Sequence, residues 1–236
     1  MVFDTTFKGD YKHMTRTKIK DRKLPIYTGG EEIFNMVTHI VGGAIGIAVL
    51  TLCVLISAMK GSALGVVCGA VFGVSMTMLY TMSSIYHGLR TDTSKKVFQI
   101  IDHCTIYFLI AGTYTPMLAC GLAQTAPMAA WITLFAVWAL AAVATTLTAI
   151  DLKKYKVFSM ICYVCMGWAI IFSIKQMYDF LGFTGFWLLL GGGIFYTSGI
   201  IFYNLGKKIK YFHSVFHIFT LFGSVLHALC VMFYVL

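Results

Sequence analysis

The sequence predicts an all-α integral membrane protein, a bundle of seven transmembrane helices with a cytoplasmic N-terminus and an external C-terminus. The first observation is composition: of 236 residues, 59% are hydrophobic and 11% are charged, and the mean hydropathy is +0.82. Soluble domains carry about 25% charged residues. The other two observations are seven long apolar segments and an uneven distribution of lysine and arginine between them. This composition excludes a soluble globular enzyme with a single membrane anchor.

Seven apolar segments are long enough to cross a bilayer, which takes about 20 residues for roughly 30 Å of hydrocarbon. They cover about residues 33–59, 63–89, 97–119, 126–149, 157–176, 182–205 and 211–236. We therefore predict two regions, a basic cytoplasmic tail over 1–30 and a seven-helix membrane domain over 31–236. The tail has no continuous apolar core, so we expect no cleavable signal peptide.

Lysine and arginine predict the orientation, because short loops rich in these residues stay on the cytoplasmic side. They gather in the tail and in the loops after the second, fourth and sixth segments: Lys8, Lys12, Arg16, Lys18, Lys20, Arg22, Lys23, Arg90, Lys95, Lys96, Lys153, Lys154, Lys156, Lys207, Lys208 and Lys210. Only Lys60 and Lys175 fall on the opposite side. We expect the basic tail and loops to attract anionic lipid head groups. The net charge of +9 therefore does not indicate nucleic-acid binding.

Histidines gather at one end of the predicted spans. The five that lie near cytoplasmic span ends are His39, His87, His103, His213 and His217. Asp102 lies at the same level, and all six positions fall roughly 3–9 Å from the span ends at 1.5 Å per residue. Ionisable side chains inside a bilayer are costly and usually face a bundle interior. We therefore expect these residues to meet on one side of the membrane.

Helical spacing makes part of this group typical of a metal site. His213 and His217 are four residues apart, so one helix face offers two imidazoles to one metal. Ser83 and His87 have the same spacing on the second segment. Three histidines with an open fourth position form the usual catalytic zinc shell. Nitrogen ligands favour zinc without excluding other transition metals.

Two further sets of residues are expected beside this site. Glu32, Asn35 and His39 fall at positions i, i+3 and i+7, on one face of the first segment. Asp102 and His103 are about 100° apart around their helix, so only one of them can face the centre. We expect Asp102 to do so and His103 to face away.

His227 and the cysteines have plainer interpretations. His227 lies ten residues beyond His217, about 15 Å deeper in the membrane, so it cannot bind the same metal. We expect it to be a hydrogen-bonded core histidine. Cys162 and Cys165 have the spacing of a metal or redox pair, but buried cysteine usually behaves as a small hydrophobic residue.

The ordered motifs resemble those of the hemolysin III proteins, in the progestin and adipoQ receptor (PAQR) family and the wider CREST superfamily, which includes alkaline ceramidases. The motifs are Glu32-x2-Asn35-x3-His39, Ser83-x3-His87, Asp102-His103 and His213-x3-His217. The resemblance covers about residues 31–236. It implies a seven-helix bundle with an intracellular N-terminus and a zinc cofactor.

The resemblance also implies roles for single residues. By it, the zinc ligands are His87, His213 and His217. Asp102 would hold or activate the metal-bound water, with Ser83 beside it. His39, Asn35 and Glu32 would occupy supporting positions around the ligands.

Three functions remain open. In a zinc-dependent, ceramidase-like lipid hydrolase, Asp102 would act as general base and Ser83 would donate to the developing oxyanion. The substrate would be a lipid amide or ester that enters from the inner leaflet. Alternatively, the protein is a non-catalytic lipid sensor with a structural zinc, since zinc sites without bound water are structural. A pore-forming cytolysin has less support, because no segment carries a polar stripe. The sequence leaves the lipid and the oligomeric state open.

Overall fold

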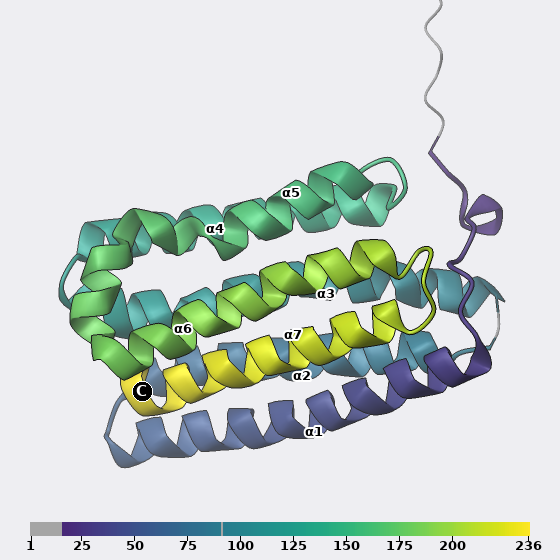
Figure 1. Ribbon diagram of the computed structural model, residues 1–236. Helices are drawn as coiled ribbons and strands as arrows, with labels where there is room; N and C mark the ends of the chain where they lie inside the picture. Colours follow the sequence, from purple (N-terminus) through teal and green to yellow (C-terminus); the bar gives the residue numbers. More distant parts are fainter. Residues whose placement is uncertain (1–15, 91) are drawn as a thin grey trace, which may run out of the picture.

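The computed structural model describes residues 16–90 and 92–236, and the regular structure of these residues is entirely helical (Figure 1). The long helices are α1 (Gly29–Met59), α2 (Ala63–Gly88), α3 (Asp92–Pro116), α4 (Pro127–Ile150), α5 (Lys156–Gly167), α6 (Ile174–Leu205) and α7 (Phe212–Cys230). Short helical turns are η1 (Ile19–Asp21), η2 (Met117–Gly121), η3 (Leu122–Gln124), η4 (Ala169–Ser173) and η5 (Val231–Val235). In this part of the chain, six helical stretches are long and apolar enough to cross a membrane. The protein is therefore an all-helical, multi-pass membrane protein.

The stretch between Lys156 and Leu205 differs from the prediction. It is one apolar helical run of 50 residues, in which no loop separates a segment 157–176 from a segment 182–205. The run changes direction at Gly182, whose φ of 65° and ψ of −176° suit a residue without a Cβ. Figure 1 shows the chain turning back between α5 and the rest of α6. The count of long apolar helices is six because this turn lies inside a continuous helical run.

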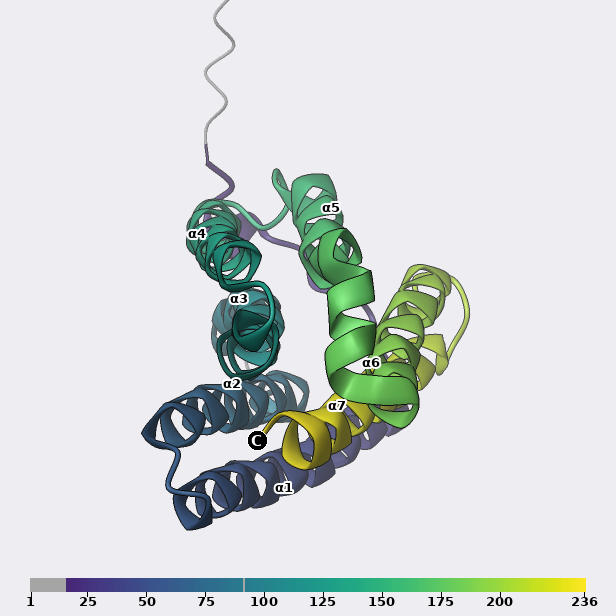
Figure 2. The same ribbon diagram turned by 90° about the vertical axis from the view of Figure 1, so that its left-hand side faces the viewer.

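The helices form two sides and a base when viewed along the bundle (Figure 2). α4, α3 and α2 lie on one side, α5, α6 and α7 lie on the other, and α1 runs across the base. α1 packs mainly on α2 and also contacts α7, while α6 packs on α7. A site built from the end of α2 and the start of α7 therefore has α1 along one side.

Local sequence determines where α1 begins. Thr28 and Glu31 form a capping box, in which the backbone N–H of Glu31 donates to Thr28 Oγ1 at 3.3 Å and the backbone N–H of Thr28 donates to the Glu31 carboxylate at 2.8 Å. Glu31 also accepts a hydrogen bond from the backbone N–H of Tyr211, at 2.7 Å, just before α7. The cap therefore ties the start of α1 to the start of α7.

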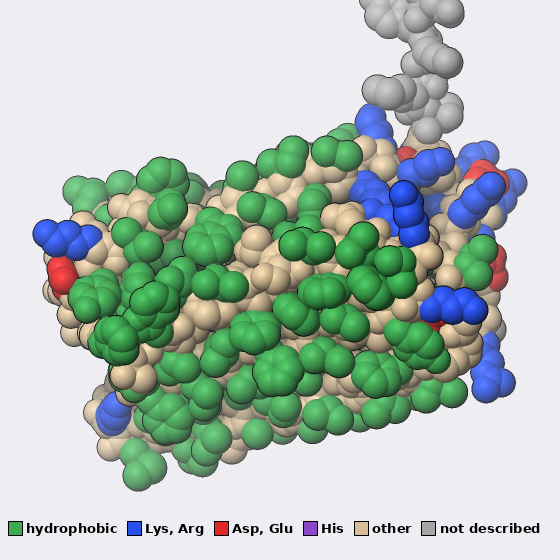
Figure 3. All heavy atoms as spheres, viewed as in Figure 1, with side chains coloured by type: hydrophobic (Ala, Val, Ile, Leu, Met, Phe, Trp, Pro, Cys, Tyr) green, Lys and Arg blue, Asp and Glu red, His purple; other side chains and the backbone are tan. Residues whose placement is uncertain are grey.

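Lysine and arginine side chains gather at the end of the bundle where α1 begins (Figure 3). We call this the basic end; it carries Arg90, Lys153, Lys154, Lys207 and Lys208. The described part of the N-terminal segment packs against it. The backbone N–H of Thr17 donates to Asp151 Oδ2 at 2.8 Å, and Lys96 Nζ donates to the carbonyl of Lys20 at 3.1 Å. The predicted tail over 1–30 thus includes residues that contact the helices, and its residues 1–15 lie outside the described structure.

Candidate metal centre

Three histidines meet at the basic end, between the last turn of α2 and the first two turns of α7. One ring nitrogen from each of His87, His213 and His217 lies within 4.8 Å of the other two. His213 Nε2 and His217 Nε2 are 3.0 Å apart, as their spacing of four residues on one helix face requires. All three side chains are buried. The structure therefore brings together the three histidines that the family resemblance implies as ligands.

A carboxylate fixes the orientation of His87. Its Nδ1–H donates to Glu32 Oε2 at 2.7 Å, and Glu32 Oε1 pairs with Lys95 Nζ, also at 2.7 Å. A carboxylate on one imidazole nitrogen leaves the lone pair of the other nitrogen available to a metal. His87 Nε2 is buried and has no hydrogen-bond partner among the described residues.

These three residues fit a zinc ion. Zinc bonds histidine nitrogen at about 2.0–2.1 Å, so tetrahedral ligand atoms lie about 3.3 Å apart. The 3.0 Å between His213 Nε2 and His217 Nε2 is already close to that spacing, and all three ligand nitrogens lie within 4.8 Å of one another. Buried polar atoms nearly always have a partner, and a metal would provide one for His87 Nε2. The donor set and this unpartnered nitrogen both match a metal with three protein ligands.

The residues of α1 surround the ligands. The ring centroid of His39 lies 3.8 Å from that of His217, with the planes tilted by 36°. Asn35 Oδ1 accepts a hydrogen bond from Ser214 Oγ at 2.7 Å, and Ser214 directly follows the ligand His213. Together with Glu32, these residues line the α1 side of the cluster.

The expected reacting residues, Ser83 and Asp102, make no hydrogen bond to the three ligands within the described residues. Ser83 is one turn before His87 on α2 and is 2% exposed. The Asp102 carboxylate makes no hydrogen bond to the three ligands within the described residues, and its Oδ2 lies 3.8 Å from Nδ1 of His103. His103 Nδ1 in turn bonds the carbonyl of Gln99 at 2.8 Å. The structure therefore brings Asp102 to the same end of the bundle, where it pairs with His103 and, among the described residues, makes no hydrogen bond or ion pair with the three ligand histidines.

Tyr27 is a residue of this site that the sequence did not reveal. Its ring stacks on His213, with centroids 4.9 Å apart and planes inclined by 23°, and its centroid is 5.9 Å from that of His87. Burial, reinforced by Tyr203 and the Glu32 carboxylate, raises the pKa of Tyr27 above its usual value. Tyr27 directly precedes Thr28, the residue that caps α1. A large apolar side chain before a capping box commonly packs back on the helix. This position of Tyr27 was the sequence signal that could have indicated its place in the site.

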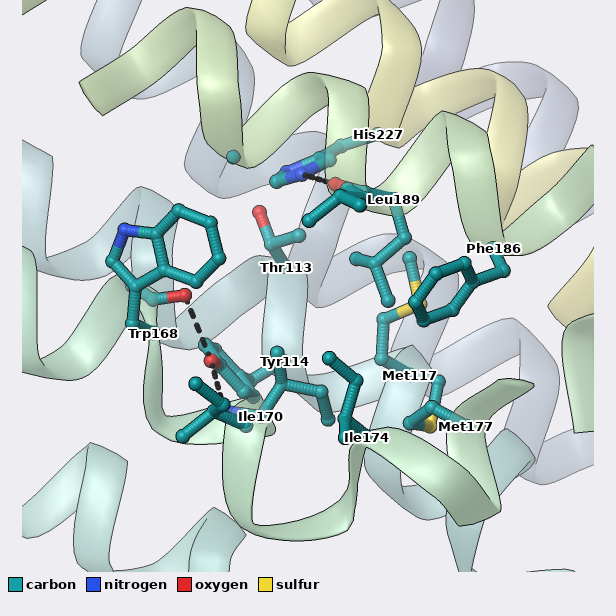
Figure 4. Close-up of a pocket in the computed structure, with 14 residues that line it drawn as sticks. Thr113, Tyr114, Met117, Trp168, Ile170, Ile174, Met177, Phe186, Leu189 and His227 are labelled. Carbon is teal, nitrogen blue, oxygen red and sulfur yellow. Dashed lines mark hydrogen bonds between the residues drawn. The ribbon is translucent and has the colours of Figure 1, made fainter. Parts of the chain in front are cut away.

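His227 belongs to a different part of the bundle. Figure 4 shows it beside a cavity between α3, η4, α6 and α7. The cavity is small, with a volume of about 50 Å³. His227 Nε2 donates to the carbonyl of Leu189 at 3.0 Å, as expected for a hydrogen-bonded core histidine. Tyr114, which also lines the cavity, donates to the carbonyl of Gly167 at 3.0 Å.

Comparison with known proteins places these histidines within one family match. The family model described as "Haemolysin-III related" matches residues 27–228, which include every histidine of the bundle. Hemolysin-3 of Bacillus cereus is 40% identical over 206 residues, 87% of this chain and 92% of that protein. The Hemolysin-3 homolog of Bacillus subtilis (strain 168) is 39% identical over 209 residues, 89% of this chain and 96% of that protein.

A more distant relative comes from animals. The human monocyte to macrophage differentiation factor is 26% identical over 162 residues, 66% of each chain. The resemblance predicted from the ordered motifs is thereby confirmed. The match of the family model over most of the chain, on a bundle of long apolar helices, shows that this protein belongs to the haemolysin-III related family of multi-pass membrane proteins.

Proposed function

We propose that this protein is a zinc-dependent hydrolase of a lipid amide or ester bond, with its site near the cytoplasmic leaflet. The observation that carries the proposal is the state of His87. Its Nδ1 is held by Glu32, while its buried Nε2 has no partner within the described residues, and one of its ring nitrogens lies within 4.8 Å of those of His213 and His217. Three imidazoles with one position left open are the usual shell of a catalytic zinc.

The proposed topology has seven spans and a cytoplasmic N-terminus. The run from Lys156 to Leu205 would supply two spans that meet at the turn at Gly182. The gathering of lysine and arginine at the basic end supports a cytoplasmic location for that end. The histidine cluster would then lie at the level of the inner leaflet, where it can meet a lipid carbonyl.

The metal ligands and the acidic residues would have separate roles in the reaction. Zinc, when bound, would polarise a carbonyl and acidify water. His87, His213 and His217 would hold it, and Glu32 would keep His87 in the binding tautomer. Asp102 would accept the proton of the attacking water as general base.

Two other residues would complete the site. Ser83, buried one turn from His87, would donate a hydrogen bond to the oxyanion. The Tyr27 ring, stacked on His213, would keep bulk water away from the ligands.

A test of turnover uses purified protein in lipid nanodiscs with defined substrates. Ceramide-like amides and ester phospholipids are supplied, and fatty acid release is measured by mass spectrometry. Asp102→Asn is expected to abolish release while the zinc content stays at one per chain. Asp179→Asn changes an exposed carboxylate on α6 and is the matched control. No release from either substrate class by the zinc-loaded wild type would contradict the proposal.

A second candidate is a lipid sensor with a structural zinc. It is favoured by the short distance between the His39 and His217 rings, because a fourth nitrogen ligand would close the site. X-ray absorption of the zinc-loaded protein separates the two. Four nitrogen ligands indicate a structural site, whereas three nitrogens and one oxygen indicate an open one.

A further inference from the structure

The α1 side of the cluster contains buried polar atoms that the three metal ligands do not use. Asn35 Nδ2 and both ring nitrogens of His39 are buried and have no hydrogen-bond partner among the described residues. Asn35 is 0% exposed and His39 is 4% exposed. Because buried polar side-chain atoms nearly always have a partner, this group indicates a bound species next to the ligands.

Two polar neighbours, Tyr80 and Ser214, bond to groups other than these unpartnered nitrogens. Tyr80, whose ring lies edge-on to His39 at 5.0 Å, donates its hydroxyl toward Ser224 Oγ at 2.6 Å. Ser214 donates to Asn35 Oδ1 at 2.7 Å, and this bond uses the oxygen end of the amide and leaves the Nδ2 end free. No protein acceptor among the described residues therefore serves these donors.

The two side chains lie on one face of α1, one helical turn apart. The amide nitrogen of Asn35 is a donor only, and a neutral imidazole offers one N–H. Two unpartnered donors one helical turn apart, with His39 packed on the ligand His217 and Asn35 bonded to the residue after His213, suit an oxygen acceptor that carries partial or full negative charge. An apolar chain or a cation would leave these donors without a partner.

We propose that Asn35 and His39 form an acyl-oxygen site, which binds the carbonyl oxygen of a lipid amide or ester and the carboxylate of the fatty acid product. This inference rests on the proposed hydrolase function, and it names the groups that recognise the substrate. During attack by water the carbonyl oxygen gains negative charge, and the pair holds that charge from the α1 side. Asn35 and His39 are then substrate-contacting residues, in addition to Ser83 on α2.

The test measures product binding separately from turnover. Full-length protein is loaded with cobalt(II), whose visible absorption reports the ligand set, and is kept in dodecyl maltoside micelles, which contain no acyl oxygen. Radiolabelled palmitate is the probe, and its dissociation constant is measured with and without cobalt. The variants are Asn35→Ala, Asn35→Asp, His39→Leu and His39→Gln.

We expect Asn35→Ala and His39→Leu each to weaken palmitate binding by about tenfold or more, which is the usual effect of losing one hydrogen bond to a charged group. Asn35→Asp should weaken binding further, since it replaces a donor with a negative charge. His39→Gln keeps a donor and should retain most of the binding. Thr38→Val, between the two residues, removes a hydroxyl that bonds only its own helix and should have no effect.

The results that would overturn the acyl-oxygen site differ from those that would overturn the proposed hydrolase function. Wild-type protein that does not bind palmitate, or variants that bind it as tightly as the wild type, would overturn the acyl-oxygen site. Loss of the cobalt spectrum in both His39 variants would instead make His39 a fourth ligand and also overturn it. If binding depends on both residues but no lipid is hydrolysed, the site stands and the proposed reaction does not.

Discussion

The carboxylate of Glu32 lies 2.7 Å from Nδ1 of His87 and joins the start of α1 to the end of α2. The same carboxylate pairs with Lys95 on α3, so one side chain links three helices beneath the metal ligands. Side chains that orient a ligand from behind typically contribute a factor of 10–100 in metal affinity.

Glu32→Ala should therefore weaken zinc binding by about 10–100-fold, measured by competition with a chromophoric chelator. Lys95→Met removes the ion pair to Glu32 Oε1 and the bonds from Lys95 Nζ to the carbonyls of His87 and Leu89, but it keeps the bond from His87 to Glu32 and should have a much smaller effect. Unchanged zinc affinity in Glu32→Ala would show that His87 is oriented without this contact.

The histidine cluster itself should determine metal content. Purified protein is expected to contain about one zinc per chain, and His213→Ala/His217→Ala should contain none, because the remaining ligand alone cannot hold the ion. Elemental analysis gives the ratio. His227→Ala is the control, since this histidine bonds Leu189 in another part of the bundle and should leave the zinc in place. Zinc-free wild-type protein would refute the site.

Tyr27 should control how fast the metal leaves. Its ring covers His213 from the side of the basic end, so Tyr27→Ala should speed zinc loss to EDTA several-fold, in line with the roughly 0.5–1.5 kcal/mol of an aromatic contact. Tyr27→Phe keeps the ring and should lose zinc at the wild-type rate. Equal rates in all three proteins would mean that stacking does not protect the site.

The contact between α6 and α7 depends on a glycine. A Cβ at Gly192 would clash with the imidazole ring of His227, whereas a Cβ at Gly191 would meet only Leu226 at 3.5 Å. Gly192→Ala should therefore destabilise the bundle by about 1–3 kcal/mol, while Gly191→Ala should be neutral. A thermal unfolding assay in detergent compares the two variants. A melting temperature for Gly192→Ala no lower than that for Gly191→Ala would contradict the close approach.

Asp151 should hold the N-terminal segment in a pH-dependent way. Burial alone would raise its pKa, but hydrogen bonds from the backbone of Thr17, Lys154 and Lys153 lower the pKa to about 2, from an ordinary value of 3.8. Because the pKa is lower in the folded state, the stabilisation that the Asp151 carboxylate gives to the attached N-terminal segment is complete above about pH 4. It is lost as the pH falls toward 2.

Pepsin cleavage within residues 16–28 measures this attachment. Cleavage of the wild type should be slow at pH 4 and increase toward pH 2, while Asp151→Asn should be cut rapidly already at pH 4. The ratio between the two proteins corrects for the activity of pepsin itself. A constant ratio of one across this range would show that Asp151 does not anchor the segment.

Long-range apolar pattern and short-range spacing made much of this protein predictable from its sequence. Helix length follows from runs of apolar residues, and most expected boundaries lie within a few residues of those observed. The convergence of His213 and His217 follows from helical geometry alone. The structure of the segment between Lys156 and Leu205 was harder to predict, because a turn made by one glycine leaves the run of apolar residues unbroken.

The sequence by itself therefore determined the membrane class, the family and which histidines share one end of the bundle, because these depend on composition, order and helical repeat. Only the tertiary structure decided which partners they meet. Glu32 reaches His87 across 55 positions, Tyr27 stacks on His213, and Asp102 pairs with His103. Such relationships depend on the rotation of each helix and on its packing against its neighbours, and helical spacing within one segment carries no information about either.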